Sequence, residues 1–192
     1  DGATWTDLGG MSESRGLVED SLGRLWSLGL YYDLRYFDGT NWFLVPNNGA
    51  GGVNLQRDPT RPGTIWASTD AEVIRTDGGY RYSRDYTQFP ELNPQSDLFS
   101  TVAAAPNGIA WLGSTQGIFR LDAESGTYDY FTSLGGISAM SASPLAVTPD
   151  GLLWYNVFDP YGTGPHGLVW FDGTNAGIYS APREGQPQWG GL

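Results

Sequence analysis

The chain has 192 residues, no cysteine and a formal net charge of −11 at pH 7, and all ten of its basic residues are arginines. Without cysteine it can form neither disulfide bonds nor thiolate metal sites, and its acidic surface repels nucleic-acid phosphates, so we expect no nucleic-acid partner. No run of about eighteen apolar residues occurs, so we expect no membrane insertion.

Residues 1–8 hold an Asp-Gly pair followed by Trp5, and the same spacing recurs at Asp38, Gly39 and Trp42. Asp-Gly pairs favour the positive φ angles of tight hairpin turns, so both segments are typical of a turn that leads into a strand. We therefore expect residues 1–8 to form the outer strand of a preceding or closing repeat unit.

A Gly-x-x-Trp tetrapeptide recurs four times, ending at Trp26, Trp66, Trp111 and Trp154, in steps of 40, 45 and 43 residues. Each tetrapeptide follows a short apolar run and a turn. It leads through a second apolar run and an acidic, glycine-containing turn into a more polar segment, and such runs are typical of strands. A residue type repeated in every unit normally belongs to the core, so we expect the four tryptophans to pack between neighbouring sheets.

The repeat predicts an all-β chain, namely a β-propeller of four-stranded antiparallel blades, because propeller blades have a period of about 40–50 residues. We expect a single propeller domain or a fragment of one, with four full blades plus partial blades at the termini. No capped apolar pattern with helical spacing extends over about eleven residues, so no long helix is expected. The full blades are predicted at approximately residues 14–46, 52–87, 100–132 and 144–182.

A propeller normally closes into a ring, because open sheet edges invite association. A chain with partial blades at both ends is therefore expected to be a segment of a larger propeller protein, whose other blades lie elsewhere in that protein or come from another chain. Two alternatives remain open. One is a ring of four or five blades in which the strand of Trp5 pairs with the last blade, and the other is an open or multi-chain arrangement.

The longer and chemically richer loops join the second strand of a unit to the third, and the fourth strand to the next unit. Aromatic rings beside carboxylates suit the stacking and hydrogen bonding of a sugar or a peptide, and loops on a rigid scaffold commonly bind ligands. The alternative for each aromatic residue, including Phe89 of this face, is packing between blades. The ligand-binding candidates are Tyr31, Tyr32, Asp33, Asp70, Glu72, Phe158, Asp159, Tyr161 and His166.

His166 is the only histidine, and no Gly-x-Ser-x-Gly nucleophile motif occurs. A catalytic triad needs a nucleophile and an acid beside the histidine, and a two-histidine metal site needs a second one, so we expect no catalytic residue, metal or cofactor. Asp33, Asp70, Glu72 and Asp159 could supply the carboxylate pair of a glycoside hydrolase, although loop acids are normally solvated.

Residues 106–122 resemble the two-component-regulator propeller repeat, whose pattern is roughly Gly-x-x-Trp-x-Gly-Thr-x-x-Gly-Leu-x-Arg-Phe-Asp, and residues 18–26 and 147–154 resemble its start. The second unit is instead similar to the Asp-box repeat, with Arg75 and Tyr82 where that motif has serine and tryptophan. The first resemblance implies a propeller of an extracellular or periplasmic sensor region, or of a bacterial surface protein, that binds a ligand without chemistry. The second implies a structural turn.

The sequence therefore predicts a non-enzymatic, extracellular, periplasmic or cell-surface propeller that binds a ligand or serves as a scaffold. The expected partners are a carbohydrate or peptide ligand, other propeller copies, or the rest of a longer chain. Two other functions remain open. One is a glycoside hydrolase with paired carboxylates. The other is a structural subunit of a filament or surface layer, in which contacts between chains bury the strand of Trp5 or the tail at Trp189.

Overall fold

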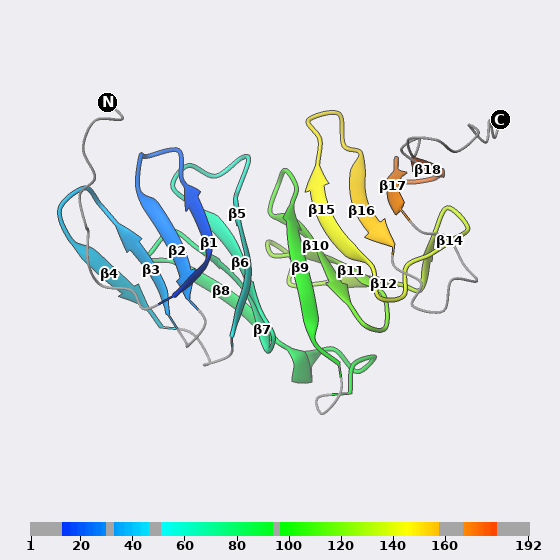
Figure 1. Ribbon diagram of the computed structural model, residues 1–192, viewed down its shortest axis with the longest axis horizontal. Helices are drawn as coiled ribbons and strands as arrows, with labels where there is room; N and C mark the ends of the chain where they lie inside the picture. The colour runs from blue at the N-terminus through cyan, green and yellow to red at the C-terminus, as the bar shows by residue number, and fades with distance from the viewer. Residues whose placement is uncertain (1–12, 30–32, 47–50, 94–96, 158–166, 180–192) are drawn as a thin grey trace, which may run out of the picture.

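The computed structural model of the chain describes residues 13–29, 33–46, 51–93, 97–157 and 167–179 (Figure 1). These residues form four four-stranded antiparallel sheets whose strands pair in chain order. Within these ranges there is no α-helix, and no helix there is long and apolar enough to cross a membrane. The predicted all-β architecture of four-stranded antiparallel units is confirmed.

Each sheet contains four consecutive strands, which we call A to D. The first sheet contains β1 (Ser14–Glu19), β2 (Leu25–Gly29), β3 (Leu34–Phe37) and β4 (Trp42–Val45). The second contains β5 (Gly52–Arg57), β6 (Ile65–Thr69), β7 (Glu72–Thr76) and β8 (Arg81–Asp85). The third contains β9 (Phe99–Ala104), β10 (Ile109–Ser114), β11 (Ile118–Asp122) and β12 (Tyr128–Phe131). The fourth contains β15 (Ser143–Val147), β16 (Leu153–Val157), β17 (Gly167–Phe171) and β18 (Ala176–Tyr179). The connections between sheets contain the 3-10 turn η1 (Tyr86–Gln88) and the short hairpin of β13 (Ser133–Leu134) and β14 (Ile137–Ser138).

The glycine of each Gly-x-x-Trp tetrapeptide lies in an A–B turn with a positive φ angle. The angles are 79° at Gly23, 69° at Gly63, 75° at Gly108 and 91° at Gly151. Residues with a Cβ atom rarely adopt this left-handed conformation, because the Cβ comes too close to the following carbonyl oxygen. Turn geometry therefore explains why a glycine begins every tetrapeptide of the repeat.

An aspartate orders each C–D turn by accepting hydrogen bonds from the backbone. In the first sheet, Oδ1 of Asp38 accepts from the N–H groups of Thr40 and Asn41, both at 2.8 Å. The same side-chain turn recurs in the other sheets, at Asp77, Asp122 and Asp172. In the second sheet this turn is the segment that resembles an Asp box, so the expectation of a structural turn is confirmed there.

The four sheets lie side by side in chain order, and the A strands β1, β5, β9 and β15 contact one another in turn (Figure 1). Alternate residues of each strand lie on the two faces of its sheet. One face carries the repeat tryptophan and is called the Trp face below, and the other is called the opposite face. The Trp face of each of the first three sheets packs on the opposite face of the following sheet.

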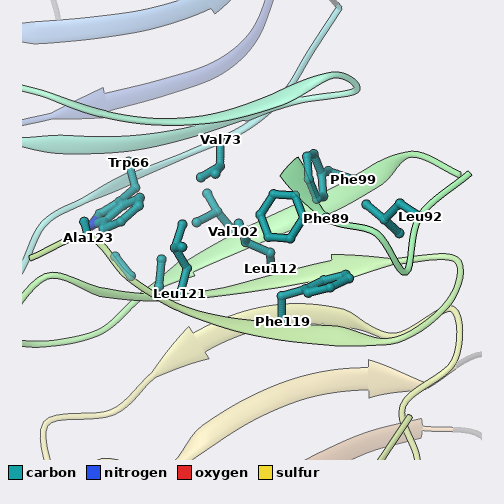
Figure 2. Packing of buried hydrophobic residues seen from close by; sticks show 12 residues of the cluster. Trp66, Val73, Phe89, Leu92, Phe99, Val102, Leu112, Phe119, Leu121 and Ala123 are labelled. Carbon is teal, nitrogen blue, oxygen red and sulfur yellow. The ribbon is translucent and has the colours of Figure 1, made fainter. Parts of the chain in front are cut away.

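The interface between the second and third sheets shows how this packing works (Figure 2). Trp66 and Val73 of the second sheet lie in one buried cluster with Val102, Leu112 and Leu121 of the third. Burying one large apolar side chain stabilises a fold by about 1.5–3 kcal/mol, so the interfaces between sheets make a large contribution to the stability of the array.

The expectation that the repeat tryptophans pack between sheets is confirmed for the first three. Trp26 and Trp66 are fully buried, and Trp111 is 9% exposed. Trp154 is only partly buried, because it lies on the Trp face of the fourth sheet, and no other described sheet covers that face. The partial blades expected at the termini, with the strand of Trp5 and the tail at Trp189, lie outside the described residues.

Candidate functional site

The structure describes part of the face on which the sequence predicts ligand contacts, that of the B–C and D–A loops. Three of the nine candidate residues, Asp33, Asp70 and Glu72, are described. The other six lie outside the described residues: Tyr31, Tyr32, Phe158, Asp159, Tyr161 and His166.

The three described candidates differ in their surroundings. Oδ1 of Asp33 accepts a hydrogen bond from Nη2 of Arg35 at 3.0 Å, and Asp70 is partly buried in its B–C loop. Glu72 lies in β7 with a fully buried side chain, and its Oε2 atom is 2.8 Å from Nη2 of Arg81. Within the described ranges, no three acidic or histidine side chains gather in a way that could hold a metal ion. Ligand binding by the nine candidates stays a prediction.

Asp97, which the sequence pattern does not mark, holds two loops of this face together. Its Oδ1 atom accepts from Oγ1 of Thr115 at 2.8 Å and from Nε2 of Gln116 at 3.1 Å, and its Oδ2 atom accepts from the N–H of Asn93 at 2.8 Å. Phe89, from the same D–A connection, is 1% exposed and belongs to the core between the sheets, which is the alternative to ligand contact. Both residues therefore shape the scaffold of this face.

The A–B and C–D turns at the other ends of the strands carry a polar network built on a buried aspartate. In the first sheet, Oδ2 of Asp20 accepts from Nε1 of Trp26 at 2.7 Å and from Nε of Arg24 at 2.8 Å. Arg24 also donates to backbone carbonyls of the second sheet, at Gly63 (2.5 Å) and Asp77 (2.8 Å). One arginine thus neutralises the aspartate and joins two sheets.

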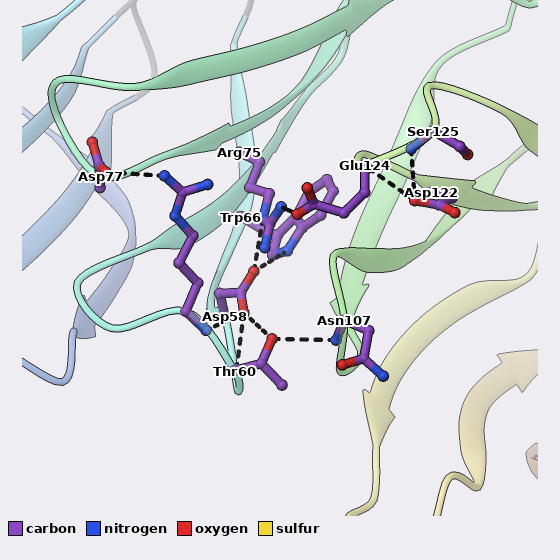
Figure 3. Close-up of polar contacts among 10 residues, drawn as sticks. Asp58, Thr60, Trp66, Arg75, Asp77, Asn107, Asp122, Glu124 and Ser125 are labelled. Carbon is purple, nitrogen blue, oxygen red and sulfur yellow. Dashed lines mark hydrogen bonds and ion pairs between the residues drawn. The ribbon is translucent and has the colours of Figure 1, made fainter.

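The second sheet has a corresponding network (Figure 3). Oδ2 of Asp58 accepts from Nε1 of Trp66 at 3.2 Å and from Nε of Arg75 at 2.8 Å. Nη1 of Arg75 is 2.5 Å from Oε1 of Glu124, which lies in the C–D turn of the third sheet. Because Asp58 and Arg75 are only 3% and 2% exposed, this ion pair is shielded from water.

The sequence contains a signal for these networks that the repeat alone does not reveal. The residue that follows strand A is an aspartate in the first two sheets, six and eight residues before the tryptophan. Ala105 and Thr148 make the same backbone contact in the third and fourth sheets. Only two of the units therefore contain a buried carboxylate at this turn, and these are the units in which an arginine bonds to it.

Both buried aspartates have a lowered pKa. Burial acts to raise the pKa of Asp58, yet the N–H groups of Arg61 and Thr60 and the positive charge of Arg75 outweigh it and hold the pKa below the ordinary value of 3.8. At Asp20, hydrogen bonds likewise outweigh burial, and the pKa is again lowered. The folded chain therefore favours the ionised form of both groups.

Acidification below about pH 4 is expected to destabilise the fold. A carboxyl group whose pKa is lowered by folding stabilises the folded state above its unfolded pKa, and this contribution is lost as the pH falls through the folded pKa. Urea unfolding followed by tryptophan fluorescence should show a falling midpoint below about pH 4, with a shallower fall in Asp58→Asn. A wild-type midpoint that is unchanged down to about pH 2 would contradict this assignment.

An open cavity of about 540 Å³ lies among the A–B turns, lined by residues of all four sheets. Small-molecule sites commonly have volumes of about 300–1,000 Å³. Gln56 in the cavity wall joins three sheets, because its Nε2 donates to the carbonyl of Leu145 at 2.7 Å and its Oε1 accepts from the N–H of Ala104 at 3.0 Å. The cavity lies on the side of the short turns, whereas the predicted ligand contacts lie on the side of the longer loops.

Solved structures share the fold of this chain, although no protein-family model and no curated protein matches its sequence. A catalytically inactive virginiamycin B lyase from Staphylococcus aureus is 15% identical with a TM-score of 0.65, over 93% of this chain and 59% of the other. The extracellular domain of a hybrid two-component system protein from B. thetaiotaomicron is 17% identical with a TM-score of 0.63, over 91% and 26%. PorZ, a bacterial surface component of the type-IX secretion system of Porphyromonas gingivalis, is 20% identical with a TM-score of 0.63, over 88% and 26%.

These likenesses establish the fold. The chain spans 59% of the length of the lyase and about a quarter of the two others. Because extracellular domains of two-component proteins share its architecture, the resemblance to two-component-regulator propellers is confirmed at the level of the propeller fold.

Proposed function

We propose that this chain is a non-enzymatic propeller module for binding and assembly at the extracellular side or the surface of a cell. Its fold is shared with the extracellular domain of a two-component protein and with a surface component of a secretion system, which supports this location. The binding role rests on the B–C and D–A loops and on the cavity among the A–B turns. The assembly role rests on the first and fourth sheets, which lie at the two ends of the array.

The observation that carries the assembly role is the open Trp face of the fourth sheet. The three preceding repeat tryptophans are buried, whereas Trp154 is partly exposed. The cross-strand register places Trp170 beside Trp154, and it pairs Leu168 with Tyr179, whose side chain is 57% exposed. Trp154, Leu168 and Trp170 are partly exposed, and a group of large apolar side chains that remain accessible on a sheet face is typical of an interaction surface.

The first sheet has a matching open surface on its opposite face. Leu17 and Leu44 are 63% and 60% exposed there, and Phe37 and Trp42 lie partly exposed in the adjoining row. Each interface within the array joins a Trp face to an opposite face, and the two open surfaces are one of each kind. We therefore infer that further blades, from another copy or from the rest of a longer chain, cover them by a head-to-tail contact.

The 192-residue chain is expected to associate head to tail as its concentration rises, because it presents both surfaces. Trp170→Ser should weaken this association by about tenfold or more, since central tryptophans commonly dominate interface energies. Sedimentation velocity over a concentration series measures the effect. Met140→Ser is the matched control, because it shortens a side chain that is 51% exposed outside both surfaces, and it should associate like the wild type.

Two results would contradict the assembly role: a chain that stays monomeric at every concentration, or a Trp170→Ser variant that associates as strongly as the wild type. The claim that the chain is non-enzymatic has a separate test, in which the chain is incubated with glycans and hydrolysis is measured. Turnover that is lost in Asp33→Asn or Asp70→Asn would favour a glycoside hydrolase instead.

A further inference from the structure

Arg57, at the end of β5, lines the cavity among the A–B turns. Its backbone belongs to the ladder with β6, but no ion pair or hydrogen bond joins its side chain to another described residue. Its side chain is exposed. Most other arginines of the described ranges contact a carboxylate, namely Arg24, Arg35, Arg61, Arg75, Arg81 and Arg120. The cavity therefore contains a cation that the described fold does not neutralise.

A guanidinium group in this position is suited to binding an anion of a particular geometry. Its planar fork of N–H donors matches the two oxygens of a carboxylate, and such bidentate pairs are among the stronger hydrogen bonds in proteins. Arg75 likewise bonds to carboxylates within this chain, through Nε to Asp58 and through Nη1 to Glu124. At Arg57, which is exposed to solvent, a corresponding carboxylate would come from outside the described fold.

The rest of the lining suits a ring that carries hydroxyl groups. Pro59, Pro62 and Val147 offer apolar surface to the C–H groups of such a ring. Oγ of Ser21 accepts from the N–H of Gly63 at 2.9 Å, so its own hydroxyl hydrogen remains available to a ligand. A cavity with an apolar wall and a few convergent polar groups is the usual form of a small-molecule site.

We propose that this cavity binds a sugar carboxylate, the chemistry of a hexuronate unit, with Arg57 pairing with its carboxylate. Ser21 donates to a ring hydroxyl, and the two prolines contact the carbon face of the ring. This site adds a ligand class to the binding part of the proposed function, and it does not depend on the association of copies.

The net charge of −11 does not exclude an anionic ligand at this position. Exposed charges farther away than the Debye length, about 8 Å at physiological ionic strength, are largely screened. Arg61 is a second cation in the lining, although it is partly occupied by Asp77 at 3.7 Å and by the ring of Tyr80 at 4.4 Å. Asp58 also lines the cavity, but Arg75 pairs with it, so the charge around the cavity is positive, in contrast to the net charge of the molecule.

Calorimetric titration with digalacturonate tests the proposal. We expect binding by the wild type and a loss of affinity of about tenfold or more in Arg57→Gln, because a charged hydrogen-bonded pair is removed. Arg15→Gln removes the same charge from an exposed arginine of β1 outside the cavity, and its affinity should remain within about twofold of the wild type. The urea midpoint of Arg57→Gln should equal that of the wild type, because the Arg57 side chain is exposed.

The dimethyl ester of digalacturonate is the matched control ligand, since it keeps both sugar rings and neutralises both carboxylates. It should bind more weakly by the same factor as Arg57→Gln. Equal affinity for the acid and the ester, or an unchanged affinity in Arg57→Gln, would overturn the proposal. Equally strong binding of inorganic sulfate or of an Asp-Glu dipeptide would overturn the assignment to a sugar acid. None of these results bears on sedimentation, so a failure here and a failure of the assembly role are distinguishable.

Discussion

Replacing Arg75 with methionine is expected to lower the free energy of unfolding by about 3–5 kcal/mol, the usual cost of removing one partner of a buried ion pair. The substitution leaves the carboxylate of Asp58, which is 3% exposed, without its cationic partner. It also breaks the bond to Glu124 that joins the second sheet to the third. Urea unfolding at pH 7, followed by tryptophan fluorescence, measures the loss.

A matched control is Arg120→Met, which removes an arginine from a solvent-exposed pair with Asp129 at 3.5 Å. Exposed pairs contribute about 0–1 kcal/mol, so this variant should unfold close to the wild type. Adding Asp58→Asn to Arg75→Met should restore part of the lost stability, because the buried charge is then removed as well. Equal effects of Arg75→Met and Arg120→Met would show that the buried network is not stabilising.

The substitution Trp66→Ala is expected to cost about 3–5 kcal/mol, as is typical of truncating a large buried aromatic side chain. Trp66 is fully buried between the second and third sheets, and its indole donates to Asp58. Trp154→Ala, at the equivalent position of the fourth sheet, should cost about half as much in the dilute chain, because its ring is already partly in water.

The comparison between these two variants tests the packing of the array. Both remove the same side chain from strand B, and they differ in whether a described sheet covers it. Trp66→Ala also removes the hydrogen bond to Asp58, a position at which the fourth sheet has Thr148. Equal losses in urea unfolding at low protein concentration would mean that Trp154 is covered as well as Trp66. A loss for Trp154→Ala that grows with protein concentration would indicate that a second copy covers this face.

Much of the fold could be predicted from the sequence, because local geometry and periodicity encode it. The left-handed φ angle at Gly108 favours glycine, and the aspartate of each C–D turn bonds to N–H groups two or three residues away. Trp66 and Trp111 recur at the repeat period because each unit has one tryptophan in its strand B. These signals lie within a few residues or repeat regularly, so they can be recognised without knowing which other strands or loops pack against them.

The candidate sites could not be predicted in the same way. Phe89 lies in a loop with polar neighbours, yet it fills the core between two sheets, because the D–A connection folds back over that core. Asp97 and Gln116 are nineteen residues apart, and only the pairing of two loops brings them together. Composition shows which chemistry a loop carries, but it does not show whether a side chain points into the protein or into water.

The sequence by itself determined the strands, the turns and the order of the sheets, because hydrophobic alternation and turn residues act over short distances. Only the tertiary structure decided which charged side chains are paired and which sheet faces are covered. Arg75 meets Glu124 across forty-nine residues of chain, the Arg57 side chain has no partner among the described residues, and Trp154 lies on a sheet face that no other described sheet covers. These outcomes depend on which surfaces the stacking of sheets brings together, and a repeat that is nearly the same in every unit does not specify them.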